Sequence, residues 1–227
     1  MLSPEEWGIV ALSLRVSVVA VLGVAPLAFA CAWALARGRF VGRVLLDALV
    51  HLPLVLPPVV TGWLLLLAFG AQGFAGRWLG TLGITLMFRW TGAALASAVM
   101  ALPLMVRAMR LSIEAVDGRL EAAARTLGAS RGRVFVSITL PLAMPGVLAG
   151  MVLGFARSLG EFGATITFVS NIPGQTQTLP LAIYAALQVP GGEGVVTRLA
   201  LLSVALSLGA LVASEILTRR IGARNVW

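Results

Sequence analysis

The chain has 227 residues, 59% of them hydrophobic and 11% charged, and its mean hydropathy of +0.97 excludes an ordinary soluble domain and predicts an integral membrane protein. All 17 basic residues are arginine, so the chain has no lysine for a Walker A loop or a Schiff base, and we expect no enzyme activity from it alone. With one cysteine, one histidine and a net charge of +8, it offers no internal disulfide or multi-histidine metal site, and the charge indicates membrane topology rather than nucleic-acid binding.

Five stretches are long and apolar enough to cross a membrane as helices. They are residues 16–36, 48–70, 91–106, 134–156 and 197–214. The first is too long for the apolar core of a signal peptide, and Glu5 and Glu6 precede it where a signal peptide carries basic residues, so we expect it to be retained as a helix. The predicted fold is therefore all-α, a polytopic transmembrane helical bundle.

Prolines interrupt the second stretch. Pro57 and Pro58 follow Pro53, and proline bends a helix and frees carbonyl groups. Thr61 and Gly62 come soon after, and a hydroxyl beside bare backbone can hydrogen-bond an oxyanion at a helix break. The alternative is a simple kink that fits a neighbouring helix.

The distribution of arginines predicts the orientation. The connections on one side carry most of them: Arg37, Arg39, Arg43, Arg107, Arg110, Arg119, Arg125, Arg131, Arg133, Arg219, Arg220 and Arg224. The other side has Arg77, Arg89 and Arg198. Because basic connections stay in the cytoplasm, we expect a multi-pass membrane protein with its N-terminus outside and its C-terminus in the cytoplasm.

The region of residues 162–192 carries no charge, yet its middle, "SNIPGQTQT", is too polar for lipid. The following "LPLAIYAALQV" is too short to cross a membrane. Irregular backbone at membrane depth must be buried in protein or line a cavity. We therefore expect an outer loop and then a half-spanning or re-entrant helix, with a sixth full span as the alternative.

The segment "EAAARTLGASRGRVFVSITLPLAMPG", residues 121–146, separates two apolar stretches. Glu121 and Arg125 are spaced to pair on one helical face, Gly128 is a natural helix stop, and Ser130 can cap a second short helix. Small and apolar residues share another face: Leu120, Ala123, Ala124 and Leu127. The pattern predicts a helix, a turn and a helix at the membrane surface, and periodicity alone fits an ordinary amphipathic surface helix equally well.

The spacing within this segment resembles the cytoplasmic EAA loop of the permeases of ATP-binding-cassette (ABC) importers. In that pattern a glycine stands six residues after a glutamate, and Ile-x-Leu-Pro begins ten residues after the glycine; here Gly128 is followed by Ile138, Leu140 and Pro141 at those places. The position six residues before Gly128 holds an alanine, and the glutamate stands one residue earlier, at Glu121.

In that family the loop is a coupling helix that docks on a cytoplasmic ATPase subunit. The resemblance implies a coupling loop over residues 113–133 in a single permease domain of residues 1–227, with ATP and magnesium bound by the partner subunit and no cofactor bound by this chain. The residues that it implies for ATPase coupling are Glu121, Ala122, Ala123, Arg125, Gly128, Ala129, Ile138, Leu140 and Pro141.

Two longer strings narrow the resemblance. "HLPLVLPPVVTG" at 51–62 and "GFARSLGEFGATITFVSNIPGQTQTLPLAIYAALQVPGGE" at 154–193 are similar to molybdate-type permeases. This implies a type I importer permease of the bacterial inner membrane that acts as a homodimer in membrane lipid, with two ATPase subunits and a periplasmic or extracellular molybdate-binding protein. Sulfate and tungstate permeases are close relatives, so the identity of the transported oxyanion stays open. A proton-coupled secondary carrier that works through Glu161 is the alternative from another class of transporter.

Arg157 and Glu161 are charged residues within an apolar region, spaced one helical turn apart. Exposing either to lipid costs about 2.5–3.5 kcal/mol near the bilayer centre, so we expect them to face each other, a water-filled path or a second subunit. An ion pair with a purely packing role is the alternative. The residues expected at the translocation pathway or its gate are Pro57, Pro58, Thr61, Arg157, Glu161 and Thr165.

Overall fold

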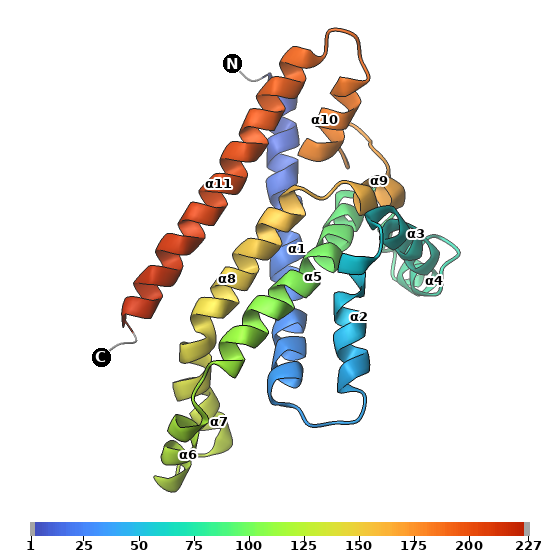
Figure 1. Cartoon of the computed structure of the whole chain (residues 1–227). Helices are drawn as coiled ribbons and strands as arrows, with labels where there is room; N and C mark the ends of the chain where they lie inside the picture. The colour runs from blue at the N-terminus through green and yellow to red at the C-terminus, as the bar shows by residue number, and fades with distance from the viewer. Residues whose placement is uncertain (1–2, 225–227) are drawn as a thin grey trace.

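The computed structural model describes the backbone of residues 3–224, the side chains of residues 3–213 and that of Ile216. These residues form helices and no strands. The elements are α1 (Pro4–Arg37), α2 (Arg43–Val55), α3 (Pro58–Phe69), α4 (Phe74–Thr81), α5 (Trp90–Glu114), α6 (Gly118–Thr126), α7 (Arg131–Val134), the π-helix η1 (Phe135–Thr139), α8 (Leu140–Leu159), α9 (Gly163–Val169), α10 (Leu179–Leu187) and α11 (Glu193–Arg224). They build an elongated bundle around α1, α5 and α8 (Figure 1).

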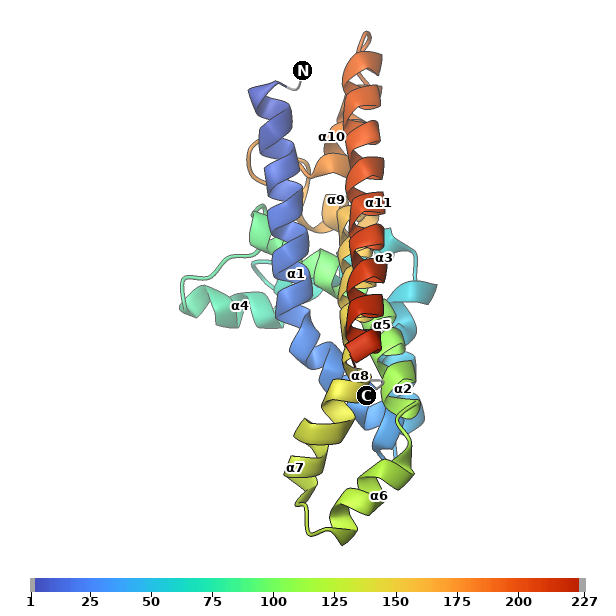
Figure 2. The same cartoon turned by 90° about the vertical axis from the view of Figure 1, so that its left-hand side faces the viewer.

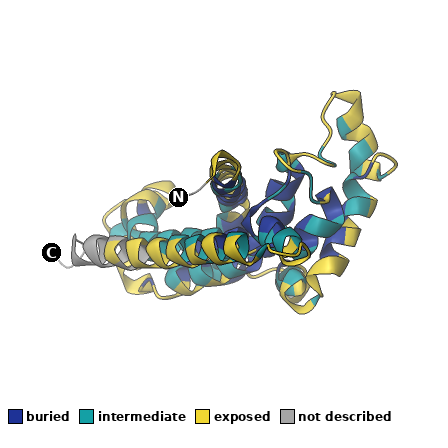
Figure 3. Ribbon diagram, turned by 90° about the horizontal axis from the view of Figure 1, so that it is seen from above, coloured by how far each residue is buried: buried dark blue, intermediate teal, exposed yellow. Residues whose placement is uncertain are grey.

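The main core lies where α5 packs between α1 and α8. Small residues of α1 and α5, among them Ala28, Ala32 and Ala101, are fully buried there, and Met105 and Met109 fill the space between them. Small side chains let apolar helices approach closely, which is how membrane helices gain packing energy. α11 packs against α8 and α10, and Figure 3 shows exposed residues along its described part.

The two ends of the bundle carry different elements (Figure 1). The connection between α1 and α2, together with α6 and α7, lies at one end, which we call the α6 end; the N-terminus, α10 and the connection from α10 to α11 lie at the other, the α10 end. Figure 2 shows the same arrangement, with α4 projecting to one side. The α6 end therefore gathers the arginines of the first connection and those of α6 and α7. The side chains of Arg219, Arg220 and Arg224 lie outside the described residues.

Four of the five predicted spans are confirmed as long apolar helices: α1, α5, the continuous run Arg131–Leu159 and α11. The first begins at Pro4, well ahead of the predicted start at residue 16. Ser3 caps it, because its hydroxyl accepts from Glu6 N at 3.2 Å while the Glu6 carboxylate accepts from Ser3 N at 2.7 Å. The acidic residues that argued against a signal peptide are thus the first turn of this helix.

The stretch of residues 48–70, predicted as one span bent at its prolines, is broken into two helices that together count as at most one span. α2 and α3 meet at 116°, because Pro57 and Pro58 lack the N–H groups that would continue the helix. Packing fixes the direction of α3: a Cβ added at Gly62 would lie 2.6 Å from Ala164 O on α9, and one added at Gly163 would lie 2.7 Å from Pro58 Cβ. The break thus brings α3 into close contact with α9.

The region of residues 162–192, predicted as an outer loop followed by a half-spanning helix, contains two short helices. The sequence did not predict α9, whereas α10 corresponds to the expected half-spanning helix. A helix of nine residues is about 13.5 Å long and cannot cross about 30 Å of hydrocarbon. Leu179 and Leu181 are fully buried, and Leu179 N donates to Ser13 Oγ of α1 at 2.7 Å. Four of the described helices are long and apolar enough to cross a membrane, or five candidate spans if the bent pair of α2 and α3 is counted as one. No sixth span is found among the described residues.

Other charged residues make contacts between helices that the sequence analysis did not predict. Arg15 lies within α1, and its guanidinium carbon is 3.8 Å from the centroid of the Trp90 ring on α5. Near the α6 end, Arg110 of α5 lies 3.2 Å from Asp47 of α2 and 2.8 Å from Glu114. A cation–π contact and an ion-pair cluster therefore join helices that hydropathy alone treats as independent.

Candidate functional site

The α6 end presents the helix-turn-helix that the sequence predicted. Asp117 caps α6 by accepting from Arg119 N at 2.8 Å, and Ser130 caps α7 by accepting from Arg133 N at 3.3 Å. Between them Gly128 has φ +85°, a left-handed conformation that costs a residue with a side chain about 1–2 kcal/mol. Gly128 thus makes the turn in which Ala129 N donates back to Ala124 O at 3.0 Å.

The apolar face of α6 has no cover in the described chain. Leu120, Ala123 and Leu127 of this face are exposed and Ala124 is partly buried, and Ala122, on another face of the helix, is exposed as well. An exposed apolar face beside small side chains is typical of a surface that meets another protein.

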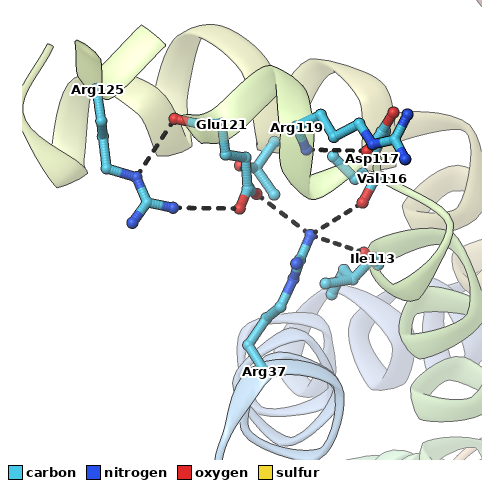
Figure 4. A network of polar contacts seen from close by, with 8 residues as sticks. Arg37, Ile113, Val116, Asp117, Arg119, Glu121 and Arg125 are labelled. Atoms are coloured by element: carbon cyan, nitrogen blue, oxygen red, sulfur yellow. Dashed lines mark hydrogen bonds and ion pairs between the residues drawn. The ribbon is translucent and has the colours of Figure 1, made fainter. Parts of the chain in front are cut away.

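Glu121 is the buried residue of α6, and its carboxylate points into the protein (Figure 4). Arg37 Nη2, at the end of α1, lies 3.2 Å from Glu121 Oε1, and Thr139 Oγ1 donates to the same oxygen at 2.7 Å. The predicted pair with Arg125 is present at 3.8 Å, and Arg125 Nε also donates to Glu121 O at 3.3 Å. Of the residues implied for ATPase coupling, Glu121 is therefore turned inward while Ala122 and Ala123 face outward.

A cavity of about 150 Å³ lies beneath this carboxylate. Its walls include Glu121, Arg125 and Arg131 together with Trp33 and Phe135. The Trp33 and Phe135 rings meet edge to face with their centroids 5.0 Å apart. Arginines of the coupling segment therefore border an aromatic contact between α1 and η1.

The Ile-x-Leu-Pro part of the motif spans the junction of η1 and α8. Ile138 is in the π-helix, whereas Leu140 and Pro141 begin α8. Leu140 N donates to Phe135 O, five residues earlier. A proline ring crowds the carbonyl four residues earlier, and a wider turn relieves that crowding. The predicted second helix is thus continuous with the span, through one π-turn.

A second cluster lies where α8 ends and α9 begins. Glu161 comes after the last residue of α8, Leu159, yet it still pairs with Arg157, whose Nη1 is 2.7 Å from Glu161 Oε2. The contact is an ion pair without a donor aligned for a hydrogen bond to Oε2. The other oxygen, Oε1, accepts from Ala164 N at 2.8 Å. Glu161 thus caps α9 while it neutralises Arg157.

Three buried hydroxyl groups on α3, α8 and α9 have no protein partners among the described residues. Thr61 on α3, Ser158 on α8 and Thr165 on α9 are buried, and their oxygens have no hydrogen-bond partner among the described residues. A buried hydroxyl that lacks a partner costs free energy, so such groups are expected to meet water or a polar ligand. Pro57 and Pro58 lie at the start of α3, which packs against α9. Of the residues predicted for the pathway, Pro58 and Thr61 on α3 and Thr165 on α9 are thus carried by helices in contact, and Glu161 joins the end of α8 to α9.

Comparison with known proteins agrees with this architecture. Residues 25–223 match the family model of the binding-protein-dependent transport system inner membrane component. The chain is 58% identical over 220 residues to the molybdenum transport system permease protein ModB of Escherichia coli (strain K12), covering 96% of each chain. It is 39% identical over 198 residues to the sulfate transport system permease protein CysT of the same strain, covering 86% of this chain and 70% of that one.

The fold is also found in solved structures. A chain of a bacterial ABC transporter involved in the import of the acidic polysaccharide alginate matches with a TM-score of 0.76 at 17% identity, covering 97% of this chain and 81% of that chain. The predicted all-α bundle of the type I ABC importer permease kind is therefore confirmed. The chain belongs to the family of binding-protein-dependent transport system inner membrane components.

Proposed function

We propose that this chain is the transmembrane permease subunit of an ABC importer and that its cargo is molybdate. The observation that carries the proposal is its 58% identity to a molybdenum transport permease over 96% of both chains, against 39% to a sulfate permease. Tungstate has the same tetrahedral shape and charge as molybdate, so it is the alternative cargo that most needs testing.

A separate ATPase subunit supplies the energy, and it docks on α6. The exposed apolar face of α6 supports this, because small side chains allow a partner to approach the helix closely. α6 and α7, which the turn at Gly128 joins, lie at one tip of the bundle (Figure 1). The docking segment includes Ala122, Ala123 and Ala129, while Ile138 and Leu140 carry the motion into the span. Movements of the ATPase are thus transmitted to the permease through the coupling loop of residues 113–133.

The α6 end faces the cytoplasm, and the N-terminus lies outside. The gathering of arginines at the α6 end supports this orientation, since basic connections are retained in the cytoplasm. The α10 end, where the polar residues 170–178 form a loop, is then the face that receives the binding protein. The C-terminal residues return to the cytoplasmic side.

Two copies of the chain form the pathway. α11 is apolar, and only 6% of the residues in its 18-residue apolar stretch are buried within the chain. Leu201, Val204 and Leu208 are exposed there. Either lipid or a second copy of the chain can cover such a helix. We place the pathway on the axis between two copies, because twofold symmetry is the commonest symmetry of homo-oligomers.

The translocation pathway passes the cluster at the α8–α9 junction. Molybdate offers only acceptor oxygens, and the hydroxyls of Thr61 and Thr165 are donors of the right kind. Arg157 is already neutralised by Glu161 at 2.7 Å, so the cluster carries no net charge that would trap an oxyanion. Binding that is weak and distributed over several donors suits conduction.

The test is to reconstitute the permease with its ATPase in vesicles and add the binding protein with one oxyanion at a time. Binding protein loaded with molybdate should stimulate ATP hydrolysis and drive uptake, whereas sulfate should not. Equal or greater stimulation by sulfate or tungstate would reassign the cargo. Uptake by the permease alone, driven by a proton gradient, would instead establish a secondary carrier.

A further inference from the structure

Arg37 joins separate segments at the α6 end. It is the last residue of α1, and its Nη2 donates to Ile113 O at 3.2 Å and Val116 O at 3.4 Å, at the C-terminal end of α5. The same nitrogen lies 3.2 Å from Glu121 Oε1 of α6, a residue 84 positions away in sequence. The last carbonyls of a helix lack partners within the helix, and a guanidinium can serve carbonyls and a carboxylate together. Arg37 thus links the ends of α1 and α5 to α6 (Figure 4).

The position of α6 depends on this contact. Glu121 is its buried residue, so α6 contributes no apolar side chain to the core among the described residues. Besides Arg37, the Glu121 carboxylate has Thr139 of η1 at 2.7 Å and Arg125 at 3.8 Å. Thr139 connects α6 to the start of α8, and Arg125 belongs to α6 itself. Arg37 is therefore the side chain through which Glu121 reaches α1 and α5.

We propose that Arg37 is a positioning residue for energy coupling: it holds α6 against the ends of α1 and α5, so that a displacement of α6 moves both helices. Residues 115–117 between α5 and α6 are not helical, and without Arg37 this short connection absorbs part of the displacement. The proposal rests on the proposed function, because it takes docking of the ATPase on α6 as given.

Loss of the guanidinium has a specific consequence. In Arg37→Gln, Glu121 keeps its hydrogen bond from Thr139, so α6 remains attached to η1 and α8. The contacts that the Arg37 guanidinium makes between α6 and the ends of α1 and α5 are lost. The Gln amide is uncharged, so the partly buried site should tolerate it. The ATPase should still bind and hydrolyse ATP, but fewer cycles should complete transport.

The experiment measures molybdate transported per ATP hydrolysed in vesicles that contain the whole complex. Arg37→Gln is compared with Arg39→Gln, which removes the same charge from an exposed position two residues away. The ratio should fall at least about fivefold in Arg37→Gln, the lower end of ordinary coupling between sites, and stay at the parent value in Arg39→Gln. Arg37→Lys, which keeps the charge but loses the planar fork, should be intermediate.

Other results would overturn the proposal. A parent-like ratio in Arg37→Gln means that Arg37 does not position α6, and an equal fall in Arg39→Gln means that charge alone matters. If Arg37 only stabilised the fold, complex yield and both rates would fall in proportion while the ratio stayed constant. Should Arg37→Gln fail to assemble, Arg37→Lys decides alone: a reduced ratio supports the proposal and a parent-like ratio refutes it.

The parent complex separates this proposal from the proposed function. If no oxyanion stimulates the parent, the importer assignment itself fails. If the parent transports sulfate or tungstate instead, the same ratio is measured with that anion, and the role of Arg37 is tested unchanged.

Discussion

Glu121 and Glu161 are both buried carboxylates that pair with an arginine, but they hold together different kinds of structure. Glu161 takes its partners from nearby in the chain, Arg157 four residues before it and Ala164 N three residues after it. Glu121 is paired with an arginine 84 residues away. The side chain of Glu161 is 1% exposed, and that of Glu121 is 12% exposed.

The difference shows what each ion pair can control. The Glu161 pair can form as soon as the chain turns from α8 into α9, so it fixes a local bend in a buried region. The Glu121 pair forms only after α1, α5 and α6 have come together, so it fixes the positions of separate helices. We therefore expect loss of the first to damage folding and loss of the second to leave the helices intact but uncoordinated.

The largest expected effect is at the local pair. Arg157→Leu leaves the Glu161 carboxylate buried and unpaired, which costs about 3–5 kcal/mol. The double variant Arg157→Leu with Glu161→Leu removes both charges and should be more stable than Arg157→Leu alone. The yield of monodisperse protein and its apparent melting temperature in detergent measure this order.

Transport by the double variant then sharpens the role of the pair. Retained uptake would indicate that the pair only supports the bend, and lost uptake in an assembled complex would indicate that it shapes the pathway. If Arg157→Leu is as stable as the parent, the carboxylate is not buried in the working protein and the comparison fails.

Packing provides a second way to compare the two regions. Gly62→Ala places a methyl group 2.6 Å from Ala164 O in the α3–α9 contact, and such overpacking costs about 1–3 kcal/mol. Gly132→Ala in α7 meets no atom within 4 Å, so it should be neutral or slightly stabilising. The melting temperatures of the two variants measure the difference; equal values would show that the α3–α9 contact is looser than described.

The distant pair should show a smaller interaction. A double-mutant cycle of Arg37→Gln and Glu121→Gln should give a coupling of about 1 kcal/mol, between the values typical of exposed and buried pairs. The free energy of unfolding in denaturing detergent is measured for the parent, the two single variants and the double variant. Additive effects would mean that Arg37 acts on the carbonyls of Ile113 and Val116 and not on Glu121.

Local sequence signals predicted the α6 end well. Spacing of three and four residues predicted the Glu121–Arg125 contact, glycine at 128 predicted the turn, and Ser130 predicted the start of α7, since each depends on residues within one or two helical turns. The pair with Arg37 could not be found in this way, because no local pattern connects residues that far apart.

The break in the second span shows a similar division. Pro57 and Pro58 predicted a bend, but its size depends on how α3 packs against α9, and α9 itself lies in a region too short and polar to give a clear helical pattern. Hydropathy also placed the start of the first span too late, because Arg15 interrupts the apolar run and its contact with Trp90 cannot be read from α1 alone.

The central claim is that the α6 end faces the cytoplasm and receives the ATPase. Leu127 is 89% exposed at the α6 end and Leu187 is 65% exposed at the α10 end, so Leu127→Cys and Leu187→Cys, each in a Cys31→Ala background, can be labelled with a membrane-impermeant maleimide. In intact cells stripped of their outer membrane, the cysteine at 187 should react and that at 127 should not. In inside-out vesicles the cysteine at 127 should react, and added ATPase subunit should protect it. Labelling of both from the same side, or unchanged labelling at 127 with the ATPase bound, would contradict the account.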